Sequence, residues 1–374
     1  VFSVVFVAVM FVYSVPLTLI VLVSLPLYFG LSLMVVPVLR GRLDEKFARG
    51  AENQAMLVET VTGIQTVKAG ALEPSFGRRW DNQLAAYIVD DAGDVVGELA
   101  DQGRDTVVSS IGYVLGSNVE NLTLSGTLTL TGIGNELDNV LTANASGSVL
   151  EGRGGNDSLK GGSAVDSLLG GDGNDRLDGG AAGDWLAGGS GNDVYVIDDA
   201  ADEIRELEGE GTDTVQSFIG YTLGASLENL TLLGAASIDG GGNELGNVIA
   251  GNAANNRLSG FSGNDTLKGG AGEDVLTGGR GNDRLEGGTA GDTYVFGRGD
   301  GQDTIVENDT SSDAVDTLRF GTGIDADQLW WRKAGNHLEV SVIGSGDKLT
   351  VSNWYLGAER HVEVFELGNG QQLL

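Results

Sequence analysis

Large apolar residues return every nine positions along two stretches of the chain, residues 134–196 and residues 242–295. The eighth position of every unit in these two arrays holds Leu, Ile or Tyr, while Gly opens nearly every unit. One nonapeptide cannot bury its own apolar side chain, whereas a stack of coils can. The period therefore predicts a solenoid in both arrays, with two nonapeptides completing each coil.

The segments in front of the two arrays are related to each other. Residues 90–124 match residues 198–232 at an offset of 108, which is twelve nonapeptides. Within the first copy a period of two, which is a strand signal, links Val107, Ser109, Ile111, Tyr113 and Leu115, and also Leu122 and Leu124. We expect short parallel strands in these spacers that continue the same coil.

The first 39 residues contain no charged side chain. As one helix they would be about 59 Å long, roughly twice the thickness of the hydrocarbon core, so two transmembrane helices over residues 1–39 fit better. Arg40, Arg42, Lys46 and Arg49 follow at once and place that end in the cytoplasm. A secretory signal peptide is the alternative, but its apolar region would span only roughly 7–15 residues.

Charge divides the chain near residue 88. Residues 1–87 carry seven basic and six acidic side chains, whereas the remainder carries 15 basic and 47 acidic side chains. Such an acidic remainder repels nucleic acid and anionic lipid, so its natural partners are cations. The chain has no cysteine, which excludes a disulfide framework.

Aspartate at the sixth position gives the repeats their chemistry. A carboxylate that returns on every coil, beside glycines that leave backbone carbonyls exposed, forms a cage of hard oxygens for Ca²⁺. We expect several Ca²⁺ ions, held by nine aspartates and by glycines at the fourth position: Asp157, Asp166, Asp175, Asp184, Asp193, Asp265, Asp274, Asp283, Asp292, Gly155, Gly173, Gly191, Gly263 and Gly281.

Stacking of every second unit divides these ligands between two edges. In the first array Asp157, Asp175 and Asp193 share one edge, and Asp166 and Asp184 share the other. The fourth position is glycine on the first edge and alanine on the second. Alanine costs roughly 1 kcal/mol or more where a loop needs a left-handed residue. We therefore expect tighter sites on the first edge and on its counterpart in the second array, Asp265 and Asp283.

Catalytic motifs are not found in this sequence. Its two histidines are His337 and His361, and it has neither an HExxH zinc motif nor a G-x-S-x-G nucleophile elbow. It also has no G-x-x-x-x-G-K-[ST] loop to cradle ATP phosphates. We expect no catalytic residues, no ATP binding and no enzyme activity.

Residues 1–87 resemble the transmembrane region of ABC exporters of type I secretion systems, most specifically over LDEKFARGAENQAMLVETVTGIQTVKA. The resemblance implies the third and fourth membrane helices of such an exporter, followed at residues 40–87 by a cytoplasmic coupling-helix-like region. Because no ATPase motif accompanies it, this part would be a membrane-associated, non-functional fragment of an exporter.

GGDGNDRLD and GGRGNDRLE match the pattern G-G-x-G-x-D-x-U-x, and residues 88–374 resemble the RTX, or haemolysin-type, calcium-binding repeat proteins. The resemblance implies a mainly β fold, a parallel β-roll or β-helix solenoid with a C-terminal β cap, here preceded by the α-helical transmembrane fragment. It also implies a chain that the type I secretion machinery exports and that folds on Ca²⁺ outside the cell. The non-catalytic part of a secreted enzyme or toxin is an alternative.

The same patterns divide the RTX-like part into five segments. Residues 88–133 and 197–241 are β-solenoid spacers, residues 134–196 and 242–305 are the arrays, and residues 306–374 are a secretion-associated β cap. Asp300 and Asp303 are further candidate ligands at the end of the second array.

Four aromatic residues of the expected cap allow two interpretations. They form either a sugar-binding platform or the core of the cap, and we favour the core: Trp330, Trp331, Trp354 and Tyr355.

The two halves predict different locations. The exporter-like part predicts a membrane protein, whereas the repeats predict an extracellular protein, since inserted helices would leave the repeats in the cytoplasm, where calcium is scarce. We interpret the chain as a gene fusion, a rearranged locus or a misassembled reading frame joined around residues 86–90. A genuine membrane-tethered calcium module is the alternative.

Overall fold

The computed structural model describes residues 86–100, 103–309 and 314–373. The expected transmembrane helices and nearly all of the coupling-helix-like region, residues 1–85, lie outside the described residues. Among the residues that are described, no helix is long and apolar enough to cross a membrane. This part is mainly β, as expected, and its three short 3-10 helices are η1 (Ala326–Gln328), η2 (Trp354–Leu356) and η3 (Ala358–Arg360).

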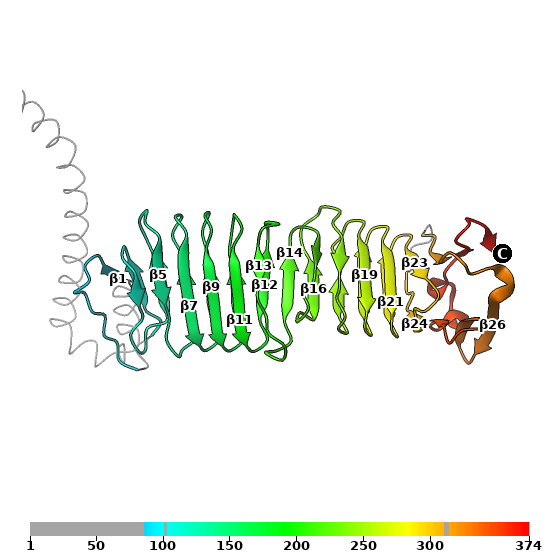
Figure 1. Cartoon of the computed structure of the whole chain (residues 1–374), viewed down its shortest axis with the longest axis horizontal. Helices are drawn as coiled ribbons and strands as arrows, with labels where there is room; N and C mark the ends of the chain where they lie inside the picture. Colours follow the sequence, from blue (N-terminus) through cyan, green and yellow to red (C-terminus); the bar gives the residue numbers. More distant parts are fainter. Residues whose placement is uncertain (1–85, 101–102, 310–313, 374) are drawn as a thin grey trace, which may run out of the picture. The chain divides into compact units, whose positions relative to one another are not determined.

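One continuous sheet of 16 strands passes through both spacers, both arrays and the cap. Its strands follow one another along the solenoid in Figure 1. In spatial order they are β1 (Ala86–Val89), β2 (Thr106–Ser109), β4 (Asn121–Leu124), β6 (Val140–Thr142), β8 (Ser158–Lys160), β10 (Arg176–Asp178), β12 (Val194–Ile197), β14 (Thr214–Ser217), β16 (Asn229–Leu232), β18 (Val248–Ala250), β20 (Thr266–Ala271), β22 (Arg284–Thr289), β24 (Gln302–Ile305), β28 (Lys348–Val351), β27 (His337–Val342) and β26 (Leu329–Ala334).

The other face of the solenoid consists of two separate sheets. The first facing sheet contains β13 (Glu203–Ile204), β11 (Trp185–Ser190), β9 (Ser167–Asp172), β7 (Ser148–Gly154), β5 (Leu130–Ile133) and β3 (Tyr113–Val114). The second contains β15 (Tyr221–Thr222), β17 (Gly240–Gly241), β19 (Arg257–Ser262), β21 (Val275–Arg280), β23 (Thr293–Phe296), β25 (Thr317–Phe320), β29 (Val364–Glu366) and β30 (Gln372–Leu373).

Each coil of the arrays is 18 residues long, so two nonapeptides complete one turn. In the continuous sheet Leu177 of β10 lies between Leu159 of β8 and Tyr195 of β12, in parallel register. The facing sheet stacks Leu150, Leu168 and Leu186 in the same way. These eighth-position side chains are at most 1 % exposed, because every coil covers the apolar residue of its neighbours.

The two spacers continue the parallel stack with coils of other lengths, since their successive strands are offset by 20, 15 and 19 residues, and the strands of the two spacers match at the 108-residue offset. β2 and β3 correspond to β14 and β15, and β1 corresponds to β12. The period-two segment from Val107 to Leu115 contains two strands in two different sheets, not one strand. The chain bends between them at Ser109, whose hydroxyl donates to the Ile111 carbonyl at 2.8 Å and accepts from the Ile111 N–H.

The cap adds an antiparallel meander to the last coil. β28 pairs in parallel with β24 of the array, and β27 and β26 follow in antiparallel order. The reversals lie at residues 335–336 and 343–346. The buried residues of this meander are Leu329, Leu338, Val340, Val342, Leu349 and Val351.

Candidate metal-binding turns

Glycine is required at two positions of a repeat unit for different steric reasons, as in the unit at residues 170–178. Gly173, at the fourth position, has φ 137°, and a Cβ there would also collide with the Gly155 carbonyl of the previous coil. Gly170, at the first position, leaves no room for a Cβ between Asp175 Oδ2 and the Gly188 carbonyl of the next coil. Backbone carbonyls of adjacent coils therefore reach directly into the turn.

The fourth position of the second edge is conformationally strained at one of the two expected alanines. Ala182 adopts φ 83°, a left-handed conformation that disfavours any residue with a Cβ. Ala164 is not in that region. The strain expected for this edge therefore applies to Ala182 and not to Ala164.

Eight of the nine repeat aspartates connect two coils by one carboxylate oxygen, whereas Asp166 Oδ2 accepts the N–H of Gly162 in its own unit. Asp175 Oδ1 accepts the N–H of Asp157 at 2.7 Å, and Asp193 Oδ1 accepts the N–H of Asp175 at 2.7 Å. The second edge repeats this bond between Asp166 N–H and Asp184 Oδ1 at 2.7 Å. The second array has the same ladder, so this half of every carboxylate is already satisfied by the backbone.

One oxygen of each of these nine carboxylates has no hydrogen-bond partner within the described part of the chain. The nine residues are at most 3 % exposed. Burying a charged oxygen without a partner is costly, so native proteins pair such atoms or coordinate them to metal. The unpartnered atoms are Oδ2 of Asp157, Asp175, Asp184, Asp193, Asp265, Asp274, Asp283 and Asp292, and Oδ1 of Asp166.

Burial shifts the protonation of these carboxyls. Desolvation is the largest cause, and it raises the pKa of Asp157, Asp184 and Asp193 to about 7 and that of Asp292 to about 8. The negative charge of neighbouring aspartates adds to the pKa shift, since Asp175 raises the pKa of both Asp157 and Asp193. Desolvation raises the pKa of the remaining repeat aspartates too: Asp166, Asp175, Asp265, Asp274 and Asp283.

The donor set of the turns fits a hard cation. Ca²⁺ takes several oxygen ligands from carboxylates and from backbone carbonyls. Within the described residues no group of three or more His, Cys, Asp or Glu side chains surrounds one point, so side chains alone would not complete such a site. The carbonyls of Gly155 and Gly188, which face the neighbouring coil, are the kind of ligand that would complement the aspartate oxygens.

The predicted ligands lie on two edges, as the 18-residue coil requires. Asp157, Asp175 and Asp193 directly precede β8, β10 and β12 of the continuous sheet, whereas Asp166 and Asp184 precede β9 and β11 of the first facing sheet. In the second array the turns before the continuous sheet carry Asp265 and Asp283, and those before the second facing sheet carry Asp274 and Asp292.

A second ladder, which the repeat pattern alone did not indicate, runs along the first edge. Asn174 Oδ1 accepts the N–H of Asn192 at 2.6 Å, and Asn156 Oδ1 accepts the N–H of Asn174 at 2.8 Å. In the first array the fifth position of the second edge holds Val165 and Gly183, which offer no side-chain acceptor, whereas in the second array Asn255 Oδ1 on the second edge accepts the N–H of Glu273 at 3.0 Å. Asparagine recurs at every eighteenth residue of the first edge in the sequence, and that spacing could have predicted the ladder.

The aspartate ladder extends past the nine predicted rungs. Asp303 Oδ1 accepts the N–H of Asp283 at 3.0 Å, and its buried Oδ2 has no partner within the described residues. Asp213, in the second spacer, accepts the N–H of Asp193 at 2.8 Å. Asp300, the other candidate, instead accepts the N–H of Gly297 in its own turn.

The cap aromatics do not form its core, so that expectation is wrong for three of them. Trp330, Trp331 and Tyr355 are 62 %, 39 % and 44 % exposed, and Trp354 is half-buried. They do not form one platform either. Trp331 and Trp354 line a cavity of about 750 Å³, whereas Trp330 and Tyr355 are not part of its lining.

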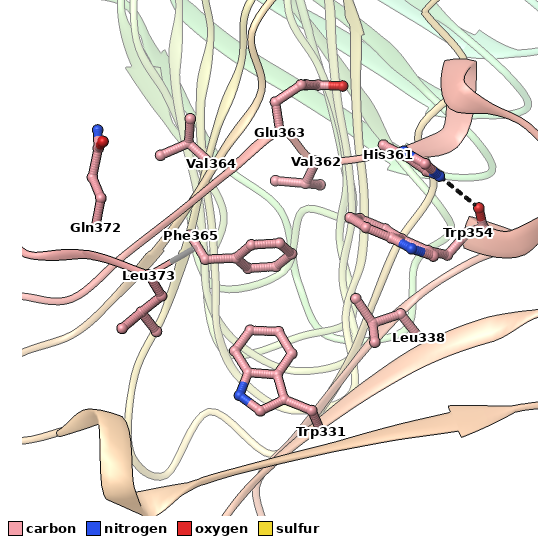
Figure 2. A pocket seen from close by; sticks show the side chains of 10 residues that line it. All are labelled: Trp331, Leu338, Trp354, His361, Val362, Glu363, Val364, Phe365, Gln372 and Leu373. Carbon is pink, nitrogen blue, oxygen red and sulfur yellow. Dashed lines mark hydrogen bonds between the residues drawn. The ribbon is translucent and has the colours of Figure 1, made fainter.

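The cavity of the cap is mainly aromatic and aliphatic inside. Trp331 meets Phe365 edge-on at 4.9 Å, and Trp354 stacks on His361 at 4.2 Å between ring centres. Figure 2 shows that Leu338 lies among these rings. His361 Nε2 lies 2.9 Å from the Trp354 carbonyl oxygen, so this histidine joins two parts of the cap.

Coils of 18 residues, joined by aspartate ladders and filled by one Leu, Ile or Tyr per nonapeptide, define this part of the chain as a repeat solenoid. A comparison with protein families shows which repeat family the solenoid matches. Residues 133–168, 160–195, 241–276 and 268–305 match the RTX calcium-binding nonapeptide repeat. Residues 337–373 match the haemolysin-type calcium binding protein related domain, and residues 1–89 match the ABC transporter transmembrane region. The chain thus joins RTX repeats to a segment that matches the transmembrane region of ABC transporters.

Curated relatives of the chain are similar to its first quarter. The cyclolysin secretion/processing ATP-binding protein CyaB of Bordetella pertussis is 69 % identical over 88 residues, which are 24 % of this chain and 12 % of that protein. The toxin RTX-I translocation ATP-binding protein of Actinobacillus pleuropneumoniae is 54 % identical over 106 residues, 28 % of this chain and 15 % of that protein. The chain therefore spans less than a fifth of the length of either relative.

Proposed function

We propose that the two arrays bind several Ca²⁺ ions in the turns between successive coils, and that this binding drives folding of the solenoid. The observation that carries the proposal is the unpartnered, buried carboxylate oxygen of each of the nine predicted aspartates. The family match to calcium-binding nonapeptide repeats supports the same ion. The predicted ligands of these turns are the nine aspartates together with Gly155, Gly173, Gly191, Gly263 and Gly281.

Bound calcium would supply positive charge beside the repeat carboxylates, none of which forms an ion pair with a basic side chain in the described residues. The backbone already occupies one oxygen of each carboxylate, holds the other in place and excludes water from it. Because a preformed site is absent from an unfolded chain, the free energy of binding becomes free energy of folding. A chain of this kind stays unfolded at cytosolic calcium and folds at the higher calcium level outside the cell, which suits export by a type I secretion system.

A calcium titration of the full-length chain, followed by far-ultraviolet circular dichroism, tests this function. We expect the β signal of the repeats to rise cooperatively as calcium increases and to disappear in excess chelator. Magnesium at the same concentration is the control, because it demands near-octahedral geometry and dehydrates reluctantly. A β signal that persists unchanged in chelator would contradict the proposal.

A second candidate function is that of a membrane-associated component of an exporter. The 69 % identity of the first 88 residues to an exporter protein favours it. Fractionation of expressing cells distinguishes the two, because a membrane component resists alkaline extraction whereas a secreted RTX protein accumulates in the medium. Sequencing of the genomic locus across codons 80–95 tests the interpretation that the two parts were joined by a rearrangement or a misassembly.

A further inference from the structure

Both arrays end on a tyrosine at the position that leucine or isoleucine holds in the other units. Tyr195 and Tyr294 are fully buried in the column of eighth-position side chains. The Tyr195 hydroxyl accepts the N–H of Gly188 at 2.6 Å, and the Tyr294 hydroxyl accepts the N–H of Gly287 at 2.8 Å. Each hydroxyl thus reaches the first position of its own unit, which carries that array's last aspartate.

A glutamate from beyond the array meets each of these hydroxyls. Tyr195 donates to Glu206, and Tyr294 donates to Glu307 at 2.5 Å. Glu307 is 2 % exposed, and Oε2 of Glu206 is buried without a partner in the described part of the chain. The same tyrosine–glutamate pair occurs at both array ends, although the loops between the two residues are unrelated in sequence. This recurrence indicates that the pair has the same role at both ends.

The last aspartate of each array lies at the same point. A Cβ on Gly188 would collide with both Asp193 Oδ2 and the Tyr195 hydroxyl, so these two oxygens lie side by side. A Cβ on Gly287 would likewise collide with Asp292 Oδ2 and with the hydroxyl of its own tyrosine. Both aspartates are 1 % exposed, and the Oδ2 atoms have no partner within the described residues.

The array ends differ from interior units in one ligand. In the interior unit at residues 170–178, a Cβ on Gly170 would meet Asp175 Oδ2 and the carbonyl of Gly188 from the next coil. At the array end the tyrosine hydroxyl, with its glutamate, takes the place of that carbonyl. A tyrosine hydroxyl that donates to a glutamate therefore replaces a backbone oxygen beside the final aspartate.

We propose that a further Ca²⁺ ion binds at the end of each array, between Asp193 and Glu206 in the first and between Asp292 and Glu307 in the second. The tyrosine is a positioning residue that holds the glutamate beside the aspartate. Two carboxylates next to one buried tyrosine hydroxyl match a divalent cation in charge, and in the described part of the chain none of these four forms an ion pair with a basic side chain. This proposal rests on calcium binding by the arrays.

The chain contains a natural control for the pair. Tyr87 donates to Glu98 at 2.8 Å, in the first copy of the 108-residue duplication. The position that corresponds to Asp193 is Ala85 in the sequence, so the second carboxylate is missing. We therefore expect no ion at Glu98.

The test is the number of Ca²⁺ ions bound per full-length chain, measured by equilibrium dialysis at saturating calcium. Glu206→Gln and Glu307→Gln are each expected to lose one ion, the double variant two, and the control Glu98→Gln none. Circular dichroism in calcium verifies that each variant is folded. A wild type that binds no calcium would refute the proposed function, whereas full occupancy of the double variant would refute this site alone.

Crystals of the wild-type chain grown with terbium test the same site without a substitution. An anomalous difference peak beside Glu206 and another beside Glu307 are expected in addition to peaks in the interior turns. Peaks confined to the interior turns would overturn the proposal, because the two glutamates would then be held by protons and not by a cation.

Discussion

Each repeat aspartate divides its two oxygens between two tasks. One oxygen accepts a backbone N–H, which in all but Asp166 belongs to the neighbouring coil, as in the bond from Asp157 to Asp175, and the other is buried without a partner in the described residues. A single side chain thus joins the coils and offers a ligand to a cation. Other residues at the same position do not reproduce this arrangement: the Oδ1 atoms of Asn139, Asn247 and Asn256 accept an N–H of their own unit, and the buried Ser148 hydroxyl has no partner in the described residues.

The exposed asparagine ladder stabilises the coils by a different route, and a substitution can test it. Asn174→Ala removes the acceptor of the Asn192 N–H, so we expect a loss of about 0.5–1.5 kcal/mol in the free energy of unfolding. The measurement is denaturant unfolding in saturating calcium. Val165→Ala, at the corresponding position of the other edge, is the control and should stay within about 0.5 kcal/mol of the wild type. Equal losses would show that the ladder contributes nothing specific.

The two edges of a coil are unequal elements, although their aspartates are equally buried. The first edge has glycine at the fourth position and the asparagine ladder at the fifth. In the first array the second edge has neither, and Ala182 is strained there at φ 83°, whereas the second edge of the second array has Gly272 at the fourth position and a bond from Glu273 to Asn255 at the fifth. In the first array, the backbone of the first edge is therefore better held in the conformation that brings carbonyls toward a cation.

We expect Asp175→Ala to lower calcium binding more than Asp184→Ala. Both variants leave one backbone N–H of the preceding coil without its acceptor, so that cost cancels between them. The difference in calcium binding between the two variants therefore compares how strongly the two turns bind calcium. Isothermal titration calorimetry of the full-length variants gives both the number of ions and their affinity. Equal losses on both edges would refute this asymmetry.

The whole solenoid accumulates carboxylates that resist ionisation in the absence of metal. In the metal-free fold, burial raises the pKa of Asp157, Asp193 and Asp265 to about 7 and that of Asp303 to about 8, above the ordinary value of 3.8. The folded chain therefore binds protons more tightly than the unfolded chain. Its metal-free stability is present at low pH and is lost as pH rises through these folded-state values.

This linkage predicts that acid partly substitutes for calcium. In excess chelator, the β signal in circular dichroism should increase as pH falls from about 8 to about 5, because protonation removes the cost of the buried charges. In calcium, the apparent affinity should fall over the same range, because protons compete for the same oxygens. A metal-free β signal that decreases toward about pH 5 would contradict this expectation.

Most of the repeat architecture was predictable, because each coil contacts mainly its neighbours. The nine-residue period alone places Leu159 and Leu177 in one column and Asp157 and Asp175 in one ladder, and the fold has both. The spacer strands were harder to predict, since a bend at Ser109 divides one period-two segment between two sheets. Such a bend depends on a local hydrogen bond that alternation does not reveal.

The cap was predicted less well for a physical reason. Its hairpin turns follow from local sequence, but the exposure of Trp330 and Trp331 depends on which face of β26 the rest of the cap covers. Because β26 is the last strand of its sheet, its side chains lose a neighbour on one side. Aromatic composition alone suggested a core that the strand order does not allow.

The sequence by itself determined the 18-residue coil, the buried column and the position of every repeat aspartate, because a strict period repeats the same contacts at the same spacing. Only the tertiary structure decided which carboxylate oxygens are left without a partner and which residues meet at the array ends. Glu206 and Glu307 reach Tyr195 and Tyr294 along loops that follow no period. Their convergence depends on the path of the folded backbone, which the repeat pattern does not encode.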